Sequence, residues 1–326
     1  MEIGKLPNKL LEDIVISTIK NRRDEVVERS AIGKDCAIVD YGDKYCILSS
    51  DPITGTEKNL GKIAVYVASN DIAASGAEPL ALLITILAPP ETSQETIKKI
   101  MVDANEASSR LNIEIVGGHT EITNAVNRIV LSMTAVGIKD KDSTQEATQV
   151  GDFVLMTKQA GMEGSTIIAE EKELELLACG ISWEELNEAK DYINSLSVLK
   201  EGMLCTDIGI KYMHDITEGG IEGAVWEASI ANGLGISINE KKIPVSAVTR
   251  KICNCFSINQ NRLISSGSML IICHPDKYNR IVTELTNNQI LVTKIGEVTD
   301  QGVYFENENG KKQIHEPGSD ELYKVI

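Results

Sequence analysis

The stretch Asn70-Asp71-Ile72-Ala73-Ala74-Ser75-Gly76-Ala77-Glu78-Pro79 places an acidic residue in an otherwise small and apolar predicted helix. Apolar residues recur upstream at helical spacing, at Ile63, Val67, Ala68 and Ile72. Gly76 favours termination and Pro79 prevents continuation, so Asp71 should lie in the last turns of a packed helix. The negative end of a helix disfavours a carboxylate, and a bound cation would remove this conflict. An exposed Asp71 that faces water or caps a neighbouring loop is the alternative, and the sequence leaves it open.

Two more carboxylates are expected near each other in the same region. Cys36–Asp40 and Lys44–Ser50 are predicted strands joined by a Tyr41-Gly42-Asp43 turn. Antiparallel pairing brings the start of the first strand next to the end of the second, so Asp35 and Asp51 should be close. Neighbouring carboxylates repel unless a cation or a proton lies between them. Turn capping by each aspartate is the alternative explanation.

Length and composition restrict the class of protein. A chain of 326 residues suits two domains, and a formal charge of −16 argues against nucleic acid as the main partner. No apolar run reaches the roughly 20 residues needed to span a bilayer, and the N-terminus lacks a signal-peptide pattern. We therefore expect a cytoplasmic protein without a membrane partner. Seven scattered cysteines do not suggest a disulfide framework, and all are expected to be mostly buried thiols.

The coarse pattern of helices and strands indicates mixed α/β structure. The N-terminal part contains a short amphipathic helix from Leu10 and, after the Asp71 helix, a strand at Leu80–Leu87 that is expected to be covered on both faces. A Thr92–Glu95 capping box then opens a helix, and strands follow at Ile113–Val116 and Arg128–Ile138. A boundary in residues 139–151 divides the chain into domains 1–148 and 149–326.

The second part alternates in a similar way. Its predicted elements are a strand at Asp152–Lys158, a helix after Gly161, a helix capped by Ser182 and Glu185, a strand at Leu263–Cys273, a helix at Lys277–Asn287, a strand at Leu291–Val298 and a hairpin around Glu308-Asn309-Gly310.

The segment Gly117-Gly118-His119-Thr120-Glu121 is a candidate ligand loop. It is predicted to follow the strand Ile113–Val116 directly, where a glycine pair lets the backbone approach a ligand closely. His119, Thr120 and Glu121 could then supply donors or metal ligands. A lone solvated histidine is the alternative.

A second polar cluster is His214-Asp215-Ile216-Thr217-Glu218-Gly219-Gly220, which opens a predicted helix. Simple capping by Thr217 or Asp215 is an alternative, but it does not explain His214 and Glu218. Near the N-terminus, Lys5 is either a solvated cation or a phosphate contact.

Five of these pieces together resemble one superfamily of ATP-binding enzymes, which includes aminoimidazole ribonucleotide (AIR) synthase, the hydrogenase maturation factor HypE, thiamine-monophosphate kinase and selenophosphate synthetase. The pieces are the Gly-x-Asp at Asp35, the Ser-Asp-Pro at Asp51, Asn70-Asp71 with Gly76-Ala77-Glu78-Pro79, the Gly-Gly-x-Thr at Thr120, and His214-Asp215-x-Thr-Glu-Gly-Gly. The chain looks closest to HypE-like proteins that lack the C-terminal cysteine tail, because it ends in Lys324-Val325-Ile326.

The resemblance implies an α/β (α+β) fold of two PurM-like domains. The N-terminal domain would have a mixed sheet with dimer-forming strands, and the C-terminal domain would be α/β. The expected protein is a homodimeric, Mg²⁺-dependent enzyme that uses ATP to phosphorylate a carbonyl, amide or phosphate oxygen of an unidentified small molecule. Alternatives are a dedicated small-molecule kinase and a catalytically inactive nucleotide-binding partner protein.

The resemblance also implies roles for individual residues. Asp35, Asp51 and Asp71 would hold Mg²⁺ and the ATP phosphates. Catalytic roles are expected for His119, Asp215 and Glu218, although His119 stands where HypE and thiamine-monophosphate kinase have aspartate. Contacts with the nucleotide are expected at Lys5, Asn70, Gly117, Gly118, Thr120, Glu121, Thr217, Gly219 and Gly220.

Overall fold

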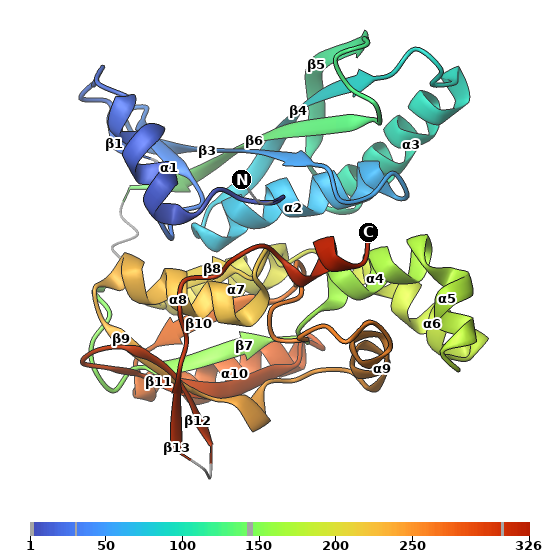
Figure 1. Ribbon diagram of the computed structural model, residues 1–326. Helices are drawn as coiled ribbons and strands as arrows, with labels where there is room; N and C mark the ends of the chain where they lie inside the picture. Colours follow the sequence, from blue (N-terminus) through green and yellow to red (C-terminus); the bar gives the residue numbers. More distant parts are fainter. Residues whose placement is uncertain (1–2, 30, 142–145, 308–309) are drawn as a thin grey trace.

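The structure is a computed structural model that describes residues 3–29, 31–141, 146–307 and 310–326. It contains two β-sheets, each with helices packed on it, and the helix α2 lies between them (Figure 1). The mixed α/β fold expected from the sequence is confirmed.

The N-terminal sheet has six strands in the order β1-β2-β3-β6-β4-β5. Strands β1 to β6 are Val26–Glu28, Ala37–Asp40, Lys44–Ile53, Glu78–Ala88, Glu114–Ile122 and Val130–Asp140, and the helices of this part are α1 (Asn8–Ile14), α2 (Leu60–Ala74) and α3 (Gln94–Arg110). Alternate residues along β3, β4 and β6 point toward α2 and α3, and they form a buried core that includes Ile47, Leu82, Leu131 and Met133.

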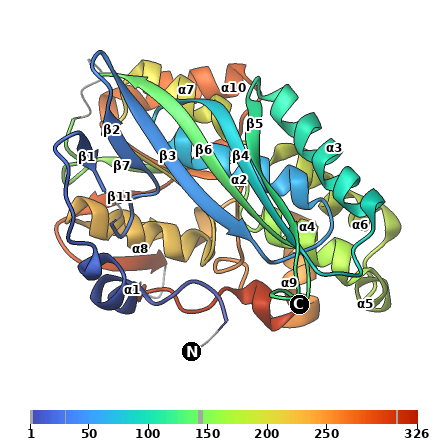
Figure 2. The ribbon, with the colours of Figure 1, turned by 90° about the horizontal axis from the view of Figure 1, so that it is seen from above.

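The opposite face of this sheet is open (Figure 2). In β4, Leu82 and Ile84 are buried, whereas Leu83 between them is 41% exposed. The expectation that Leu80–Leu87 is covered on both faces is therefore wrong for this chain alone. Ser50 and Thr134 of the neighbouring strands hydrogen-bond to each other on the open face, with 2.9 Å between their hydroxyl oxygens.

The C-terminal sheet has seven strands in the order β13-β12-β9-β11-β7-β10-β8. Strands β7 to β13 are Phe153–Thr157, Tyr212–Asp215, Gly235–Asn239, Met269–Cys273, Val292–Thr299, Val303–Asn307 and Gly310–Gln313. The helices are α4 (Met162–Glu171), α5 (Glu173–Ala178), α6 (Trp183–Asp191), α7 (Leu199–Ile208), α8 (Gly220–Asn232), α9 (Ala247–Phe256) and α10 (Tyr278–Asn287).

Both faces of this second sheet are covered. Helix α8 packs through Ile221 and Val225 against strand residues such as Val154 and Leu270. Helices α7 and α10 pack against the other face, which carries Leu155 and Ile271. The central strands β7 and β10 are therefore nearly continuous apolar runs, as expected where a sheet is buried on both sides, whereas β13 at the edge is polar and exposed.

The two domains meet along α2 and α7. The glycine at position 202 allows the backbones to approach closely, because a Cβ added there would lie 2.5 Å from the carbonyl oxygen of Ala73. The buried side-chain amide of Asn70 donates to the Leu196 carbonyl oxygen and accepts from the Val198 N–H, both at 2.8 Å. Residues of both domains thus fix the position of the helix that carries Asp71.

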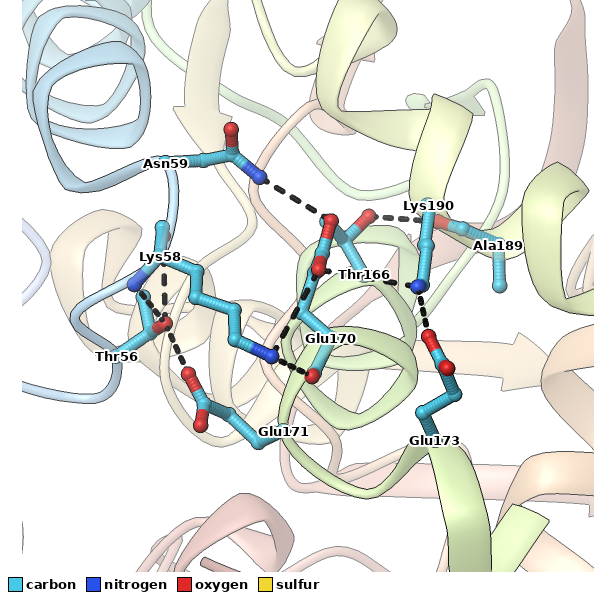
Figure 3. Close-up of polar contacts among 9 residues, drawn as sticks. All are labelled: Thr56, Lys58, Asn59, Thr166, Glu170, Glu171, Glu173, Ala189 and Lys190. Atoms are coloured by element: carbon cyan, nitrogen blue, oxygen red, sulfur yellow. Dashed lines mark hydrogen bonds and ion pairs between the residues drawn. The ribbon is translucent and has the colours of Figure 1, made fainter. Parts of the chain in front are cut away.

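A second set of contacts joins the loop before α2 to the end of α4 (Figure 3). The Thr56 hydroxyl donates to Glu171 at 2.9 Å, and the Lys58 ammonium donates to the Glu170 carbonyl oxygen. The Asn59 amide also reaches the Glu170 carboxylate, at 3.4 Å. These polar groups form an interdomain contact at the end of α2 opposite to Asp71.

Several local expectations need correction. The helix α3 is capped by Ser93, whose hydroxyl accepts from the Thr96 N–H at 3.0 Å, and not by a box starting at Thr92. Only Met269–Cys273 of the predicted strand 263–273 is extended, because the preceding serine-rich segment forms a turn. The capping box of Ser182 and Glu185 is confirmed. Of the hairpin predicted around Glu308-Asn309-Gly310, β12 and β13 pair as expected, whereas Glu308 and Asn309 lie outside the described residues.

The cysteines also differ from expectation. Cys179, at the end of α5, forms a disulfide with Cys255 on α9. The prediction that all seven are thiols is therefore wrong. The two cysteines are 76 residues apart in sequence, and the fold brings their side chains together. Cys36, Cys205, Cys253 and Cys273 are free and buried.

The apolar side of the N-terminal helix is less buried than its pattern suggests. Ile14 and Ile19 are 51% and 52% exposed, and Asn8 is the buried residue of α1. Among the described residues, no helix is both long and apolar enough to cross a membrane.

We predict that Gly202→Ala lowers the free energy of unfolding by about 1–3 kcal/mol, because the new methyl group forces α2 and α7 apart. Urea denaturation measures this change. The matched control is Asp207→Ala on the exposed side of the same helix, which should change stability by no more than about 0.5 kcal/mol. Equal stability of the two variants would show that the close helix contact contributes little.

Candidate functional site

Four carboxylates form one cluster at the interface between the domains. Asp35 lies just before β2, Asp51 is in β3, Asp71 is in the last turn of α2, and Asp215 ends β8. Asp71 is 8% exposed and Asp215 is fully buried. The structure therefore brings together the three predicted metal ligands and adds Asp215, which was predicted as catalytic, from the other domain.

Few hydrogen bonds stabilise the negative charge of this cluster. The Ser49 hydroxyl contacts Asp71 and also Asp51, at 3.1 Å, but one hydroxyl has only one proton to donate. Within the described parts of the chain, neither carboxylate oxygen of Asp215 has a hydrogen-bond partner. A buried acidic group without a partner is costly, so this part of the cluster lacks a positive charge or a donor.

Burial raises the pKa of Asp71 well above its usual range, and the carboxylates of Asp215, Asp51 and Asp35 raise it further. The same two causes raise the pKa of Asp215 to about 7: burial first, then the charge of Asp35. Like-charged groups this close cannot all ionise without a counter-charge. The arrangement suits a divalent cation that prefers oxygen ligands, such as Mg²⁺.

A chain of ion pairs lies on the C-terminal side of the cluster. His214 of β8 contacts Asp35 Oδ2 through Nδ1 at 2.7 Å and Glu227 Oε2 of α8 through Nε2 at 3.0 Å. Lys5 Nζ contacts the other oxygen of Glu227 at 3.0 Å. Lys5 and Glu227 are thus paired in this structure. The nearest positive charges, those of His214 and Lys5, pair with Asp35 and Glu227 and not with Asp215.

The pKa values follow from these contacts. Burial would lower the pKa of His214, but Asp35 and Glu227 raise it well above the usual value. Burial raises the pKa of Glu227, but the hydrogen bonds and charges of His214 and Lys5 prevail and lower it to about 2. Burial likewise opposes a raised pKa of Lys5, and Glu227 outweighs it.

The predicted glycine pair lies at the entrance to α8. Gly219 and Gly220 have φ angles of 82° and 58°, and a Cβ on Gly220 would lie 2.6 Å from the Asn261 carbonyl oxygen. The Gly219 N–H donates to Asp320 Oδ2 at 2.7 Å. A small pocket opens beside it, lined by Lys5, Leu6, Asn8, Glu218, Gly219, Glu227, Pro317, Gly318 and Asp320.

Residues near the C-terminal end of the chain form hydrogen bonds with polar groups beside this pocket. The predicted catalytic residue Glu218 accepts a hydrogen bond from the Tyr323 hydroxyl at 2.7 Å. Asp320 also accepts from the N–H groups of Ile264 and Leu322, at 3.2 and 2.8 Å. Thr217 precedes the pair, and its carbonyl oxygen accepts from the Gly220 N–H at 3.1 Å.

The segment Gly117–Glu121 is not part of this cluster within one chain. It lies inside the edge strand β5, so the prediction of a loop after the strand is wrong. In the strand register, His119 pairs with Thr85, Thr85 with Ser132, and Ser132 with Pro52. Three strand spacings of about 4.8 Å place His119 about 14 Å from the strand that carries Asp51.

Strand pairing explains why this segment contains a glycine at position 118. A Cβ on Gly118 would lie 1.8 Å from the Ile84 carbonyl oxygen, so the glycine permits close pairing of β5 with β4. His119 and Glu121 are exposed, with 3.4 Å between Nε2 and Oε2. The nucleotide contacts predicted at Gly117, Gly118, Thr120 and Glu121 stay predictions.

Asn70 occupies a different place from the one expected. Its side-chain nitrogen donates to the Leu196 carbonyl oxygen, and its side-chain oxygen accepts from the Val198 N–H, as described above. In this structure it holds the domains together one residue before Asp71, and direct contact with a nucleotide stays a prediction.

Sequence reasoning missed three residues. Ser49 and Glu227 become part of the site only through folding, although an acid among Ala224, Val225 and Ala228 on a buried helix face was a visible signal. The third, Glu163 in the first turn of α4, is 3% exposed, and its Oε2 has no hydrogen-bond partner in the part of the chain that the structure describes. Burial raises the pKa of Glu163 to about 7, and the carboxylates of Asp320 and Glu218 contribute to this rise.

Comparison with known proteins identifies the family. Residues 33–139 match the model of the N-terminal domain of AIR synthase related proteins, and residues 149–306 match the model of the C-terminal domain. A putative hydrogenase expression/formation protein of Methanocaldococcus jannaschii is 26% identical, over 99% of this chain and 97% of its own length.

Two further proteins are similar over most of the chain. Thiamine-monophosphate kinase of Pyrococcus horikoshii is 24% identical, over 89% of this chain and 90% of its own. A crystal structure of the hydrogenase maturation protein HypE in complex with ATP has a TM-score of 0.73 at 16% identity and covers 100% of this chain and 98% of its own. This last likeness shows the fold.

We predict that Glu163→Gln removes a pH dependence of stability. Because the pKa of Glu163 is about 7 in the folded protein and near 4.5 in the unfolded chain, the folded protein binds more protons between these values. Glu163 should therefore make the free energy of unfolding fall as pH rises through this window, by up to about 3 kcal/mol. The variant should lack this contribution and show a shallower fall, because Asp71 and Asp215 keep theirs. Urea denaturation at pH 4.5 to 8 measures it.

The control for this series is Glu12→Gln, at an exposed position of α1. It should follow the wild-type pH profile. A Glu163→Gln profile parallel to that of the wild type would contradict the prediction.

Proposed function

Because the chain belongs to the family of AIR synthase related proteins, we propose that it is an enzyme that binds ATP with Mg²⁺ and phosphorylates an oxygen atom of a small molecule. The phosphorylated oxygen would be that of a carbonyl, amide or phosphate group. The observation that carries this proposal is the cluster of Asp35, Asp51, Asp71 and Asp215, of which Asp71 and Asp215 are buried and Asp215 has no hydrogen-bond partner among the described residues.

The donor set of the cluster fits Mg²⁺, which prefers carboxylate oxygens and retains bound water. Asp51 and Asp71 offer oxygens from the N-terminal domain, and Asp215 offers two unpaired oxygens from the other domain. When bound, Mg²⁺ neutralises phosphate charge, which a protein of formal charge −16 needs in order to accept ATP.

The surrounding residues have distinct proposed tasks. Lys5 and the Gly219 N–H lie beside the pocket and are suited to phosphate oxygens once Glu227 and Asp320 release them. Glu218 lies at the same pocket, and we propose that it contacts the substrate. The relatives support ATP as the phosphate donor, since HypE is known in complex with ATP and another relative is a kinase.

Two other functions remain in competition. A kinase would leave phosphate on its product, whereas an enzyme of the dehydratase type, as the name carbamoyl dehydratase given to Escherichia coli HypE indicates, would release it. A nucleotide-binding partner protein would do neither. Assays of ADP, free phosphate and phosphorylated product with candidate substrates distinguish the three.

We also propose that the protein is a homodimer formed through the open face of the N-terminal sheet. This face presents apolar and hydroxyl side chains of β3, β4 and β6, among them Leu83 and Thr134. The adjoining edge strand β5 exposes Val116 and Ile122, at 54% and 51%. A second copy would cover these residues, and we propose that His119 acts at this interface.

We predict that Mg²⁺ and ATP together raise the melting temperature far more than either alone. ATP phosphates near the cluster would be repelled without the cation, and a ligand present at 100 times its dissociation constant stabilises the folded state by about 2.7 kcal/mol. Asp71→Asn should abolish the joint effect while leaving the empty protein as stable or more stable. Differential scanning fluorimetry measures both.

Asp103→Asn is the matched control, since Asp103 is also a buried helical aspartate of the N-terminal domain but pairs with Lys99 on its own helix. It should keep the joint effect of Mg²⁺ and ATP. Equal stabilisation by ATP without metal, or wild-type binding by a folded Asp71→Asn protein, would refute the assignment.

We predict that Leu83→Lys converts the dimer to a monomer, because a charge buried without a partner at the centre of the open face opposes association. Light scattering after gel filtration gives the mass. Val102→Lys on α3, at a residue that is 55% exposed, is the control and should stay dimeric. A wild-type protein that is monomeric at all concentrations, or a dimeric Leu83→Lys variant, would exclude this interface.

A further inference from the structure

We propose that the Cys179–Cys255 disulfide is a site of reversible thiol exchange that controls the order of the glycine turn at the start of α8. The bond joins the end of α5 to the last turn of α9. A small thiol such as glutathione opens it, and glutathione disulfide closes it again. The exchange concerns the disulfide alone, whereas its effect on ligand binding rests on the proposed function.

The disulfide is accessible to a small thiol. Cys179 is exposed and Cys255 is half-buried. The next residue, Gly180, has a φ angle of 88°, and a Cβ added there would meet no described atom within 4 Å, so this turn projects into open space. Exposed disulfides are the readily reduced ones, because a thiolate must approach one of the two sulfurs directly. The free cysteines that burial protects from the same reagent are Cys36, Cys205, Cys253 and Cys273.

The exchange consists of two balanced steps. The thiolate of one glutathione attacks the Cys179 sulfur and forms a mixed disulfide there, while Cys255 leaves as a thiolate and takes a proton from water. A second glutathione thiolate attacks the glutathione sulfur of the mixed disulfide, which yields glutathione disulfide and releases Cys179, also to be protonated by water. The protein disulfide thus gains two electrons, and two glutathione molecules supply them.

Reduction leaves most of α9 in place. At the start of this helix the Ser246 hydroxyl accepts from the Thr249 N–H at 2.8 Å, and the Thr249 hydroxyl oxygen lies 2.9 Å from that of Ser165 on α4. Ile252, in the middle of the helix, is fully buried in the core. The disulfide is attached at the opposite end, next to the last helical residue, Phe256. Reduction therefore frees the last turn of α9 and the residues after it.

Residues 257–262, which follow α9, support the glycine turn. The Asn259 side-chain amide donates to Glu222 Oε1 in the first turn of α8 at 3.0 Å. The Asn261 carbonyl oxygen accepts from the Glu222 N–H at 3.1 Å. The same oxygen is the atom that would lie 2.6 Å from a Cβ on Gly220. A segment that the disulfide anchors at one end thus packs directly against the turn that we assign to phosphate.

The redox state should therefore change how well this turn is prepared for a ligand. A turn held in one conformation loses less conformational entropy on binding than a mobile turn does. The oxidised protein keeps residues 257–262 against the turn, and the reduced protein allows both to move. Oxidation should strengthen binding at the start of α8, and reduction should weaken it.

The test uses the full chain without nucleotide, before and after treatment with excess reduced glutathione. Alkylation followed by peptide mass analysis should show new thiols at Cys179 and Cys255 alone. Hydrogen–deuterium exchange should then be about tenfold faster or more in residues 257–262 and in the first turn of α8. Exchange in the strands β7 and β10 should stay unchanged.

Two variants separate the disulfide from other effects of the thiol. Cys179→Ser keeps the bond open without any reagent, so it should exchange like the reduced wild type and not respond to glutathione. Cys46→Ser is the matched control, because it removes a half-buried free cysteine of β3, and it should respond as the wild type does. A disulfide that resists glutathione in the folded protein would overturn the proposal. So would equal exchange in both redox states, or faster exchange throughout the C-terminal domain.

Failure of this proposal and failure of the proposed function are distinguishable. The joint rise in melting temperature with Mg²⁺ and ATP should be smaller in the reduced protein and in Cys179→Ser than in the oxidised wild type. If the proposed function is wrong, that rise is absent in both redox states while the difference in exchange persists. If the disulfide does not control the turn, the rise is the same in both states.

Discussion

The burial of several like charges in one place is the constraint on which the structure of this site depends. Asp71 and Asp215 come from different domains and approach each other in a dry interface, where desolvation and mutual repulsion both oppose ionisation. Such an arrangement persists only if the rest of the fold holds it. Close packing of α2 on α7 at Gly202 and the interdomain hydrogen bonds of Asn70 do so from either side.

The positive charges of the region are distributed unevenly. His214 and Lys5 form an alternating chain with Asp35 and Glu227, and in this chain each charge has an opposite neighbour. Among the described residues, the Ser49 hydroxyl is the donor for Asp51 and Asp71, and Asp215 has no donor. The positive charges of the protein therefore neutralise only part of the cluster. An added cation would be stabilised most beside Asp51, Asp71 and Asp215.

The sequence predicted the parts of this arrangement that depend on local pattern. Helical spacing and the glycine at position 76 predicted the end of α2 and the place of Asp71 in it. The predicted antiparallel pairing of β2 with β3 placed Asp35 close to Asp51. Long-range contacts were not predictable in this way. Glu227 and Lys5 are 222 residues apart, and the Cys179–Cys255 disulfide depends on how α5 packs on α9. The glycine pair at 117–118 was placed in a loop, whereas it lies inside β5, because a close approach to strand β4 requires the same residue as a close approach to a ligand.

The division of ligands between the domains couples the site to the interface. Asp35, Asp51 and Asp71 belong to the N-terminal domain, and His214 and Asp215 belong to the C-terminal one. A cation held by both sets binds only when the domains are in contact, so its binding free energy also stabilises that contact. The contacts of Thr56 and Lys58 with the end of α4, shown in Figure 3, lie at the other end of α2. Contacts between the domains thus hold α2 at both of its ends, and the ligand Asp71 lies at one of them.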